Sequence, residues 1–237
     1  MKNLILVFGI FLVFGFSSCD AQFGKLLKQV GLEELNTDEI AAGLKEALSK
    51  GTSKGSDQLS VKDGFYKSIY KILLPPEAKA VTDKLRVIPG FDKVEENMLE
   101  KINRAAEDAA VKAKPIFLSA IKQMTIKDAW NILKGEDNAA TQYLMRTTQT
   151  ALYAEFKPVI TESLNKFGAL NYWSTEVNKY NQITLVKKAN PDVADHVTNK
   201  ALEGLFKKIA EEENDIRHNF ASRTTDLLKK VFAKQDK

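Results

Sequence analysis

NKALEGLFKKIAEEENDIRHNFASRTTDLL, residues 199–228, decides the fold, because its apolar side chains recur at steps of three and four residues. This spacing predicts an amphipathic helix that begins a few residues earlier, breaks near Asn219 and is followed by a shorter helix folding back. The residues that share the apolar face are Val193, Val197, Ala201, Leu205, Ile209, Ile216 and Phe220. Glu213 lies on the same face, between Ile209 and Ile216, so helical geometry points this carboxylate inward.

Helical periodicity recurs along the chain back to residue 36. Residues 65–74 alternate only loosely, and the sequence contains no convincing sheet. We therefore predict an all-α fold, a single compact domain of about eight packed helices over residues 36–234. Asn36 with Glu39, and Thr125 with Asp128, have the spacing of capping boxes that start helices. The expected breaks and bends lie at Asp63-Gly64, Pro75-Pro76, Pro89-Gly90, Pro115, Gly135, Pro158 and Gly168.

Three parts of this domain have specific expected conformations. Gly51 and Gly55 lie on the apolar side of the first helix, which predicts a close crossing with another helix. Residues 65–74 end at a pair of prolines and are predicted to form an extended crossing segment. Residues 92–113 are predicted to form one continuous helix with an alanine-rich face.

The composition is that of a folded globular chain, with 237 residues, 44% hydrophobic and 28% charged. A single Cys excludes a disulfide framework. The net charge is +4, but the basic residues are interleaved with acidic ones along the chain. Nucleic-acid-binding proteins more often gather basic residues on one face or in one tail, so we expect no nucleic-acid partner.

The N-terminus has the pattern of an export signal. Lys2 precedes a run of thirteen mostly apolar residues from Leu4 to Phe16. As a helix this run is only about 20 Å long, which is too short to span a bilayer. We predict that residues 1–18 are a signal peptide. The sequence Phe16-Ser17-Ser18-Cys19 resembles a bacterial lipobox, although Leu is usual at the first position.

In that class of precursor the Cys thiol receives a diacylglyceryl group and becomes the new N-terminus after cleavage. We therefore expect Cys19 to be a lipid anchor, residues 19–35 to be a tether, and the domain to lie in the cell envelope facing the periplasm or the exterior. Two or three acyl chains make a durable anchor. The alternative is an ordinary signal peptide that is cleaved after Ala21, with Cys19 discarded.

The carboxylates at residues 211–213 are the most unusual chemistry in the chain. Glu211 and Glu212 are expected in solvent, but an inward Glu213 needs a partner to remain charged. The predicted buried or half-buried ion-pair network consists of Glu213, Arg217, Arg223, Arg104 and Glu107. In this network Glu213 pairs with Arg217 four residues later or with Arg223 across the helix break. The alternative is a ligand-binding or acid–base carboxylate.

A second candidate site is an apolar pocket beside the Pro158 bend. The aromatic residues that would line it are Tyr143, Tyr153, Phe156, Phe167 and Trp173, with Tyr172 beside them. Aromatic residues at helical spacing otherwise form part of the core.

No catalytic constellation is found in the sequence. His196 and His218 are the only histidines, and neither is flanked as in a nucleophile–base arrangement. Asp215 and His218 have half the spacing of a helical-bundle metal site, but the second half is missing, so we expect no metal and no cofactor.

Several blocks of residues together resemble one family, the bacterial domain of unknown function family 4197. The matching blocks are DGF (63–65), NRAAE (103–107), MTIKDA (124–129), residues 139–144, ALEGLF (201–206), AEEENDIR (210–217) and RTTDLLKKVF (223–232). The resemblance covers Glu39 to Phe232 and implies a helical, exported bacterial domain with no established activity. It therefore supplies no catalytic residues. The chain departs from the family pattern at Phe220, because the family has a Pro at this position that starts the last helix. The segment before Pro75 is also less regular than the family pattern.

From these observations we expect an exported bacterial lipoprotein that is not an enzyme and acts as a binding or scaffold module of the cell envelope. The alternative is a carrier of a lipid or other apolar ligand between its helices. A contiguous apolar cavity of several hundred Å³ would favour the carrier, whereas an exposed apolar patch would favour the binding module.

Overall fold

The computed structural model describes residues 36–76, 78–79, 83, 93–166, 178, 181–182 and 192–233. The residues from Thr37 onward form a compact unit. The described residues form helices, turns and irregular segments, without a strand, so the all-α class is confirmed. The predicted signal peptide, Cys19 and the tether all lie outside the described residues, as do Phe167 and Trp173. The expected number of helices depends in part on undescribed residues as well.

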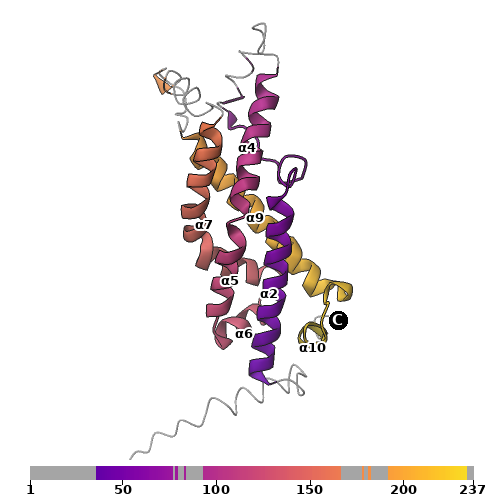
Figure 1. Cartoon of the computed structure of the whole chain (residues 1–237). Coiled ribbons are helices and arrows are strands. Elements are labelled where there is room, and N and C mark those ends of the chain that lie inside the picture. Colours follow the sequence, from indigo (N-terminus) through magenta and orange to yellow (C-terminus); the bar gives the residue numbers. More distant parts are fainter. Residues whose placement is uncertain are drawn as a thin grey trace, which may run out of the picture. The chain divides into compact units, whose positions relative to one another are not determined.

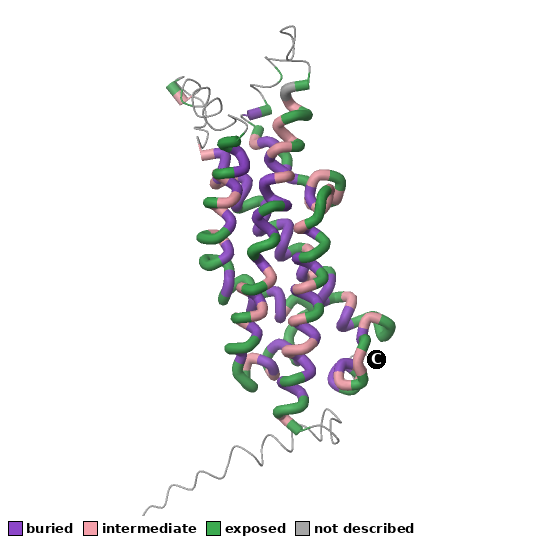
Figure 2. The backbone as a smooth tube through the Cα atoms, viewed as in Figure 1, coloured by how far each residue is buried: buried purple, intermediate pink, exposed green. Residues whose placement is uncertain are grey.

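Seven α-helices and one 3-10 helix are described between Thr37 and Phe232, namely α2 (Thr37–Ser60), α4 (Val94–Ala110), α5 (Ala113–Gln123), α6 (Ile126–Lys134), α7 (Ala139–Asn165), α9 (Val193–His218), η1 (Phe220–Ser222) and α10 (Asp226–Phe232). Figure 1 shows α4 and α5 as one column, with α7 on one side and α2 on the other. Helix α9 crosses this layer diagonally and contacts α2, α4 and α7. Buried residues line the faces between these helices (Figure 2).

Helix α9 has the buried face that its sequence predicts. Asp192 caps its start by accepting a hydrogen bond from the Asp195 amide at 2.9 Å. The predicted apolar residues from Val193 to Ile216 are buried. Phe220 is an exception, because it is 58% exposed. The helix ends at His218, so Phe220 leaves the helical face and its ring lies 5.9 Å from the Lys229 ammonium.

The close helix crossing predicted at the glycines of α2 is confirmed. A Cβ atom added to Gly55 would lie 2.9 Å from the Cδ1 atom of Ile209, and one added to Gly51 would lie 3.5 Å from that of Ile216. Both isoleucines belong to α9. The two helices can approach each other closely because α2 has no side chain at residues 51 and 55. This brings the middle of α2 against the acidic second half of α9.

The helix predicted over residues 92–113 is interrupted. Helix α4 ends at Ala110, and α5 begins at Ala113. Pro115 has no amide to donate to the carbonyl of Val111, four residues earlier, and its ring crowds that carbonyl. The break therefore lies one turn before the proline. The alanines Ala105, Ala109 and Ala113 are completely buried, which lets neighbouring helices approach closely.

Two other helix starts agree with the sequence. Thr125 and Asp128 form the predicted capping box at α6, and Gly135 ends that helix. Helix α7 begins directly after Asn138 and continues through Pro158 to Asn165. None of the helices within the described residues is long and apolar enough to cross a membrane.

The extended crossing segment predicted over residues 65–74 is wrong in its first half, because residues 61–70 form turns and bends. Residues 71–75 have no regular secondary structure. Asp63 has a positive φ of 72°, and a Cβ atom on Gly64 would lie 2.5 Å from the Gln58 carbonyl oxygen, so the predicted turn at these two residues is confirmed. Phe65 is completely buried and lies against α9 at Gly204, where an added Cβ would meet its ring at 2.9 Å.

Candidate functional site

The Glu213 carboxylate is buried where α9 passes the start of α7. Its Oε1 accepts a hydrogen bond from the Ala140 amide at 2.9 Å, and its Oε2 accepts bonds from the Thr141 amide and hydroxyl, both at 2.8 Å. Amides in the first turn of a helix have no acceptor within the helix, and the positive end of the helix dipole favours a carboxylate there. Glu213 therefore caps α7 from a different helix.

Arg217 joins Glu213 to a third helix. Its Nε and Nη2 atoms donate to Glu213 Oε1 at 3.0 and 2.8 Å, so the pair expected four residues apart is present. Nη2 also donates to the carbonyl oxygen of Ile132, in the last turn of α6, at 2.8 Å. The Arg217 side chain is 3% exposed. One buried ion pair thus ties the start of α7 and the end of α6 to α9.

Arg223 closes the end of α9. It is completely buried, and its Nε and Nη2 atoms donate to the carbonyls of Ile216 and Arg217 at 2.9 and 2.6 Å. The last carbonyls of a helix lack intrahelical donors, so Arg223 supplies them. Its guanidinium also lies 5.7 Å from the Phe232 ring of α10. We name Glu213, Arg217 and Arg223 the Glu213 cluster.

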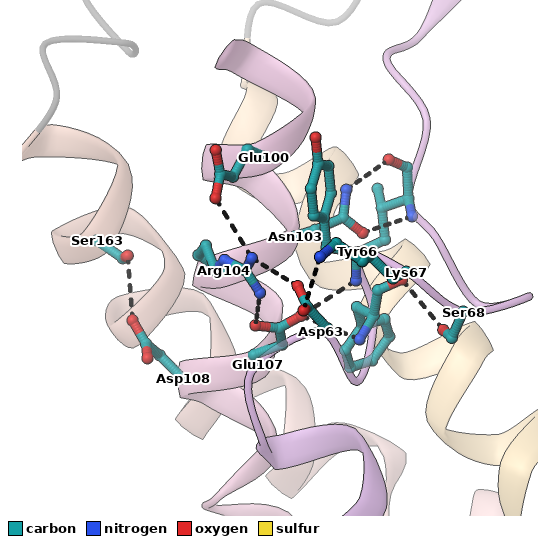
Figure 3. Close-up of polar contacts among 12 residues, drawn as sticks. Asp63, Tyr66, Lys67, Ser68, Glu100, Asn103, Arg104, Glu107, Asp108 and Ser163 are labelled. Carbon is teal, nitrogen blue, oxygen red and sulfur yellow. Dashed lines mark hydrogen bonds and ion pairs between the residues drawn. The ribbon is translucent and has the colours of Figure 1, made fainter. Parts of the chain in front are cut away.

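Arg104 and Glu107 belong to a different cluster, which corrects the prediction of a single network. Figure 3 shows them on α4, pointing toward the turns that follow α2. Glu107 Oε1 accepts hydrogen bonds from the amides of Phe65 and Tyr66, both at 3.1 Å, and its Oε2 accepts one from Arg104 at 2.8 Å. Arg104 also donates to Asp63 at 2.7 Å. We name Asp63, Arg104 and Glu107 the Glu107 cluster.

Asn103 extends the Glu107 cluster and was not predicted. Its side-chain oxygen accepts from the Ile72 amide at 2.7 Å, and its nitrogen donates to the Ile72 carbonyl at 2.9 Å (Figure 3). The nitrogen also donates to the Leu99 carbonyl at 2.7 Å. The side chain thus pairs with Ile72 as a neighbouring strand would. The signal in the sequence is a polar amide next to the buried Ile102, in a helix whose other buried residues, apart from Glu107, are apolar.

Glu212 was expected in solvent and is instead buried, with 4% of its surface exposed. It accepts from Lys54 of α2 at 2.7 Å and from Lys208 at 2.9 Å. The close α2–α9 crossing covers it, since its Cβ lies 3.6 Å from where a Gly51 Cβ would be. Glu211 stays exposed and accepts a hydrogen bond from the Tyr70 hydroxyl.

The electrostatics of these clusters favour the charged forms. The hydrogen bond to Glu107 raises the pKa of Arg104, and the hydrogen bond from Arg104 lowers the pKa of Asp63. The hydrogen bond to Glu212 raises the pKa of Lys54. Each shift follows from pairing with an opposite charge, which is how structural ion pairs behave.

Asp215 and His218, which have half the spacing of a helical-bundle metal site, contact different partners. Asp215 accepts hydrogen bonds from Ser222 and Asn219, and the Ser222 bond lowers the pKa of this carboxyl. His218 instead lies 3.0 Å from Asp137. Among the described residues, no group of three or more His, Cys, Asp or Glu side chains is placed so that it could hold a metal ion.

Of the aromatic residues proposed for a pocket, the three that the structure describes do not line a common one. Phe156 is completely buried in the core. Tyr143 lines an open groove of about 590 Å³ between α5 and α7, whereas Tyr153 lines a separate surface hollow and donates to Asp195. Beside the Glu213 cluster, a space between α2, α9 and α10 measures about 20 Å³, which holds about one water molecule.

Comparison with protein families finds one match: the model described as Protein of unknown function (DUF4197) matches residues 34–233. No curated protein and no solved structure matches the chain.

Proposed function

The chain belongs to the family Protein of unknown function (DUF4197), and we propose that it is a non-enzymatic binding or scaffold module held in the bacterial cell envelope by a lipid on Cys19. The observation that carries this proposal is that the charged residues in the sequence blocks shared with the family hold the fold together. Glu107 and Glu213 each accept two backbone amides and pair with an arginine, so they hold separate segments together.

A catalytic acid or base needs contact with a substrate and a proton to exchange. The side chains of Glu107 and Glu213 are only 4% and 6% exposed. Their oxygens face amides and guanidinium groups that belong to the fold. This geometry supports a structural role for the two clusters, and it leaves the surface of the helical body as the part that acts on other molecules.

The envelope location is supported by the sequence. The charged start, the short apolar run and the serines before Cys19 follow the order of a lipoprotein signal. With a lipid on Cys19, the compact unit from Thr37 onward is carried on a tether of about seventeen residues and faces the periplasm or the exterior.

The alternative function is a carrier of a lipid or other apolar ligand. A carrier requires an apolar space of several hundred Å³ between helices. The space beside the core at the Glu213 cluster is about 20 Å³, Tyr143 and Tyr153 open onto separate surface hollows, and Phe156 is buried in the core. These observations favour the binding module over the carrier.

Native mass spectrometry of the mature protein from its own host tests the proposal. We expect the N-terminal residue to be an acylated Cys19 and the protein to leave the membrane with a stoichiometric envelope protein. A Cys19→Ser variant should lose the acyl mass and the membrane association. A co-purifying lipid in place of a protein would establish the carrier, and an unmodified N-terminus would overturn the lipid anchor.

A further inference from the structure

The segment after α2 exposes aliphatic side chains to solvent at its tip. Ile69 is 86% exposed and Leu73 is 65% exposed, and Val61 at the start of the segment is 57% exposed. Isolated exposed apolar residues are common on protein surfaces. Here the two most exposed ones stand four residues apart on one short segment.

The segment is held firmly in this conformation. Asn103 pairs with both backbone groups of Ile72, and Glu107 accepts the amides of Phe65 and Tyr66. Ile72 is 2% exposed, so the register of the segment is fixed. Ile69 and Leu73 cannot turn inward without breaking these contacts, and the fold therefore presents them outward in advance of any binding.

Basic side chains line the same groove as the exposed aliphatic ones. An open groove of about 300 Å³ separates residues 69–76 from α9 and is lined by Lys71, Lys200 and Lys207, with Glu203 as its one acidic residue. The Lys71 ammonium lies 4.7 Å from the Tyr66 ring. Lys200 and Lys207 both pair with Glu203 and are 50% and 66% exposed. The groove thus combines an apolar edge with an excess of positive charge.

We propose that Ile69, Leu73 and the lysines of this groove form a docking site for an anionic membrane surface. This inference rests on the proposed envelope location, which supplies the membrane. Exposed aliphatic side chains beside lysines match an interface that is apolar below and negatively charged above.

The test uses the mature protein on vesicles. Cys19 is the only Cys in the chain, so an Ile69→Cys variant carries one reactive thiol when Cys19 is acylated or removed. An environment-sensitive dye on residue 69 is compared with the same dye on Ile126→Cys. Ile126 is 45% exposed and begins α6, beside the first half of α2, whereas the segment follows the last residue of α2 (Figure 1).

On vesicles with about 30% phosphatidylglycerol, we expect spin-labelled lipids to quench the dye at residue 69 and to leave the dye at residue 126 unquenched. Sodium chloride at about 1 M should release residue 69, because it shortens the Debye length to about 3 Å. A Lys71→Gln substitution should lower the docking constant roughly fivefold, whereas Lys127→Gln on α6 should leave it unchanged.

Two results would overturn the docking site: no quenching at residue 69 on anionic vesicles, or equal quenching on neutral ones. The dye reports lipid contact whether or not Cys19 is acylated. Failure of the anchor, read from the N-terminal mass, is therefore distinguishable from failure of the docking site.

Discussion

Replacing Glu213 with Gln changes one oxygen to an amide group without changing the size of the side chain. In the native protein the two oxygens accept five hydrogen bonds, from Ala140, Thr141 and Arg217. Every group that faces this side chain is a donor. The amide nitrogen of Gln must therefore face another donor, and Arg217 keeps its charge in a site that is 3% exposed.

Removing one partner of a buried ion pair costs about 3–5 kcal/mol of folding free energy. Gln retains one carbonyl oxygen that can accept from some of the donors, so we expect the lower end, about 3 kcal/mol. For a chain of this size, 1 kcal/mol corresponds to about 2–4 °C in Tm, which gives a decrease of about 6–12 °C.

Urea unfolding followed by circular dichroism at the helical band measures this loss. The matched control is Glu211→Gln, two residues earlier on the same helix, where the side chain is 49% exposed and the expected loss is under about 1 kcal/mol. Adding Arg217→Met to Glu213→Gln should restore part of the stability, because it removes the unpaired buried charge. Equal losses for the Glu213 and Glu211 variants would refute the assignment of Glu213 as a structural cap.

Three further outcomes are expected. Gly51→Ala should stabilise the protein by up to about 1 kcal/mol, because the new methyl group meets only ordinary contacts and Ala favours the helix. Gly64→Ala should destabilise it by about 1–3 kcal/mol, because its Cβ would meet backbone oxygens. Thermal unfolding compares the two variants, and equal changes in stability would contradict this packing. Asn103→Leu leaves both backbone groups of Ile72 without the side chain that pairs with them, so it should cost roughly 1–3 kcal/mol per group and speed hydrogen exchange of the Ile72 amide, and unchanged exchange would rule out this pairing. Hydrogen bonds from two lysines lower the pKa of Glu203 to about 2 from its ordinary value of 4.5, so this pair stabilises the fold above pH 4.5 and its contribution is lost as the pH falls through about 2. Because these side chains are exposed, the interaction should contribute less than about 1 kcal/mol to stability. An NMR titration of the Glu203 carboxyl carbon with a midpoint near 4.5 would disprove its pairing with the lysines.

The helices could be predicted because their causes are local. The apolar spacing of α9, the capping box of α6 and the break at Asp63-Gly64 each depend on residues within a few positions of one another. Errors occurred where a local rule competes with another. Phe220 continues the apolar spacing of α9, but the helix ends two residues before it.

The clusters could be predicted only in part, because they depend on which helices meet. The Glu213–Arg217 pair follows from a spacing of four residues. In contrast, Glu213 capping α7 joins residues more than seventy positions apart, and Glu107 holding Phe65 joins residues 42 apart. Glu212 is buried because the glycines of α2 admit α9, which no property of residue 212 itself indicates.

Hydrogen exchange at the Ala140 and Thr141 amides of the unmodified protein tests the central claim most directly. Both lie in the first turn of α7, where exchange is normally fast because no helical acceptor is available. With Glu213 as their acceptor, both amides should exchange as slowly as those in the middle of α7, and Glu213→Ala should accelerate them selectively. Fast exchange of these two amides in the unmodified protein would show that the carboxylate does not hold the helix, and would reopen a functional role for Glu213.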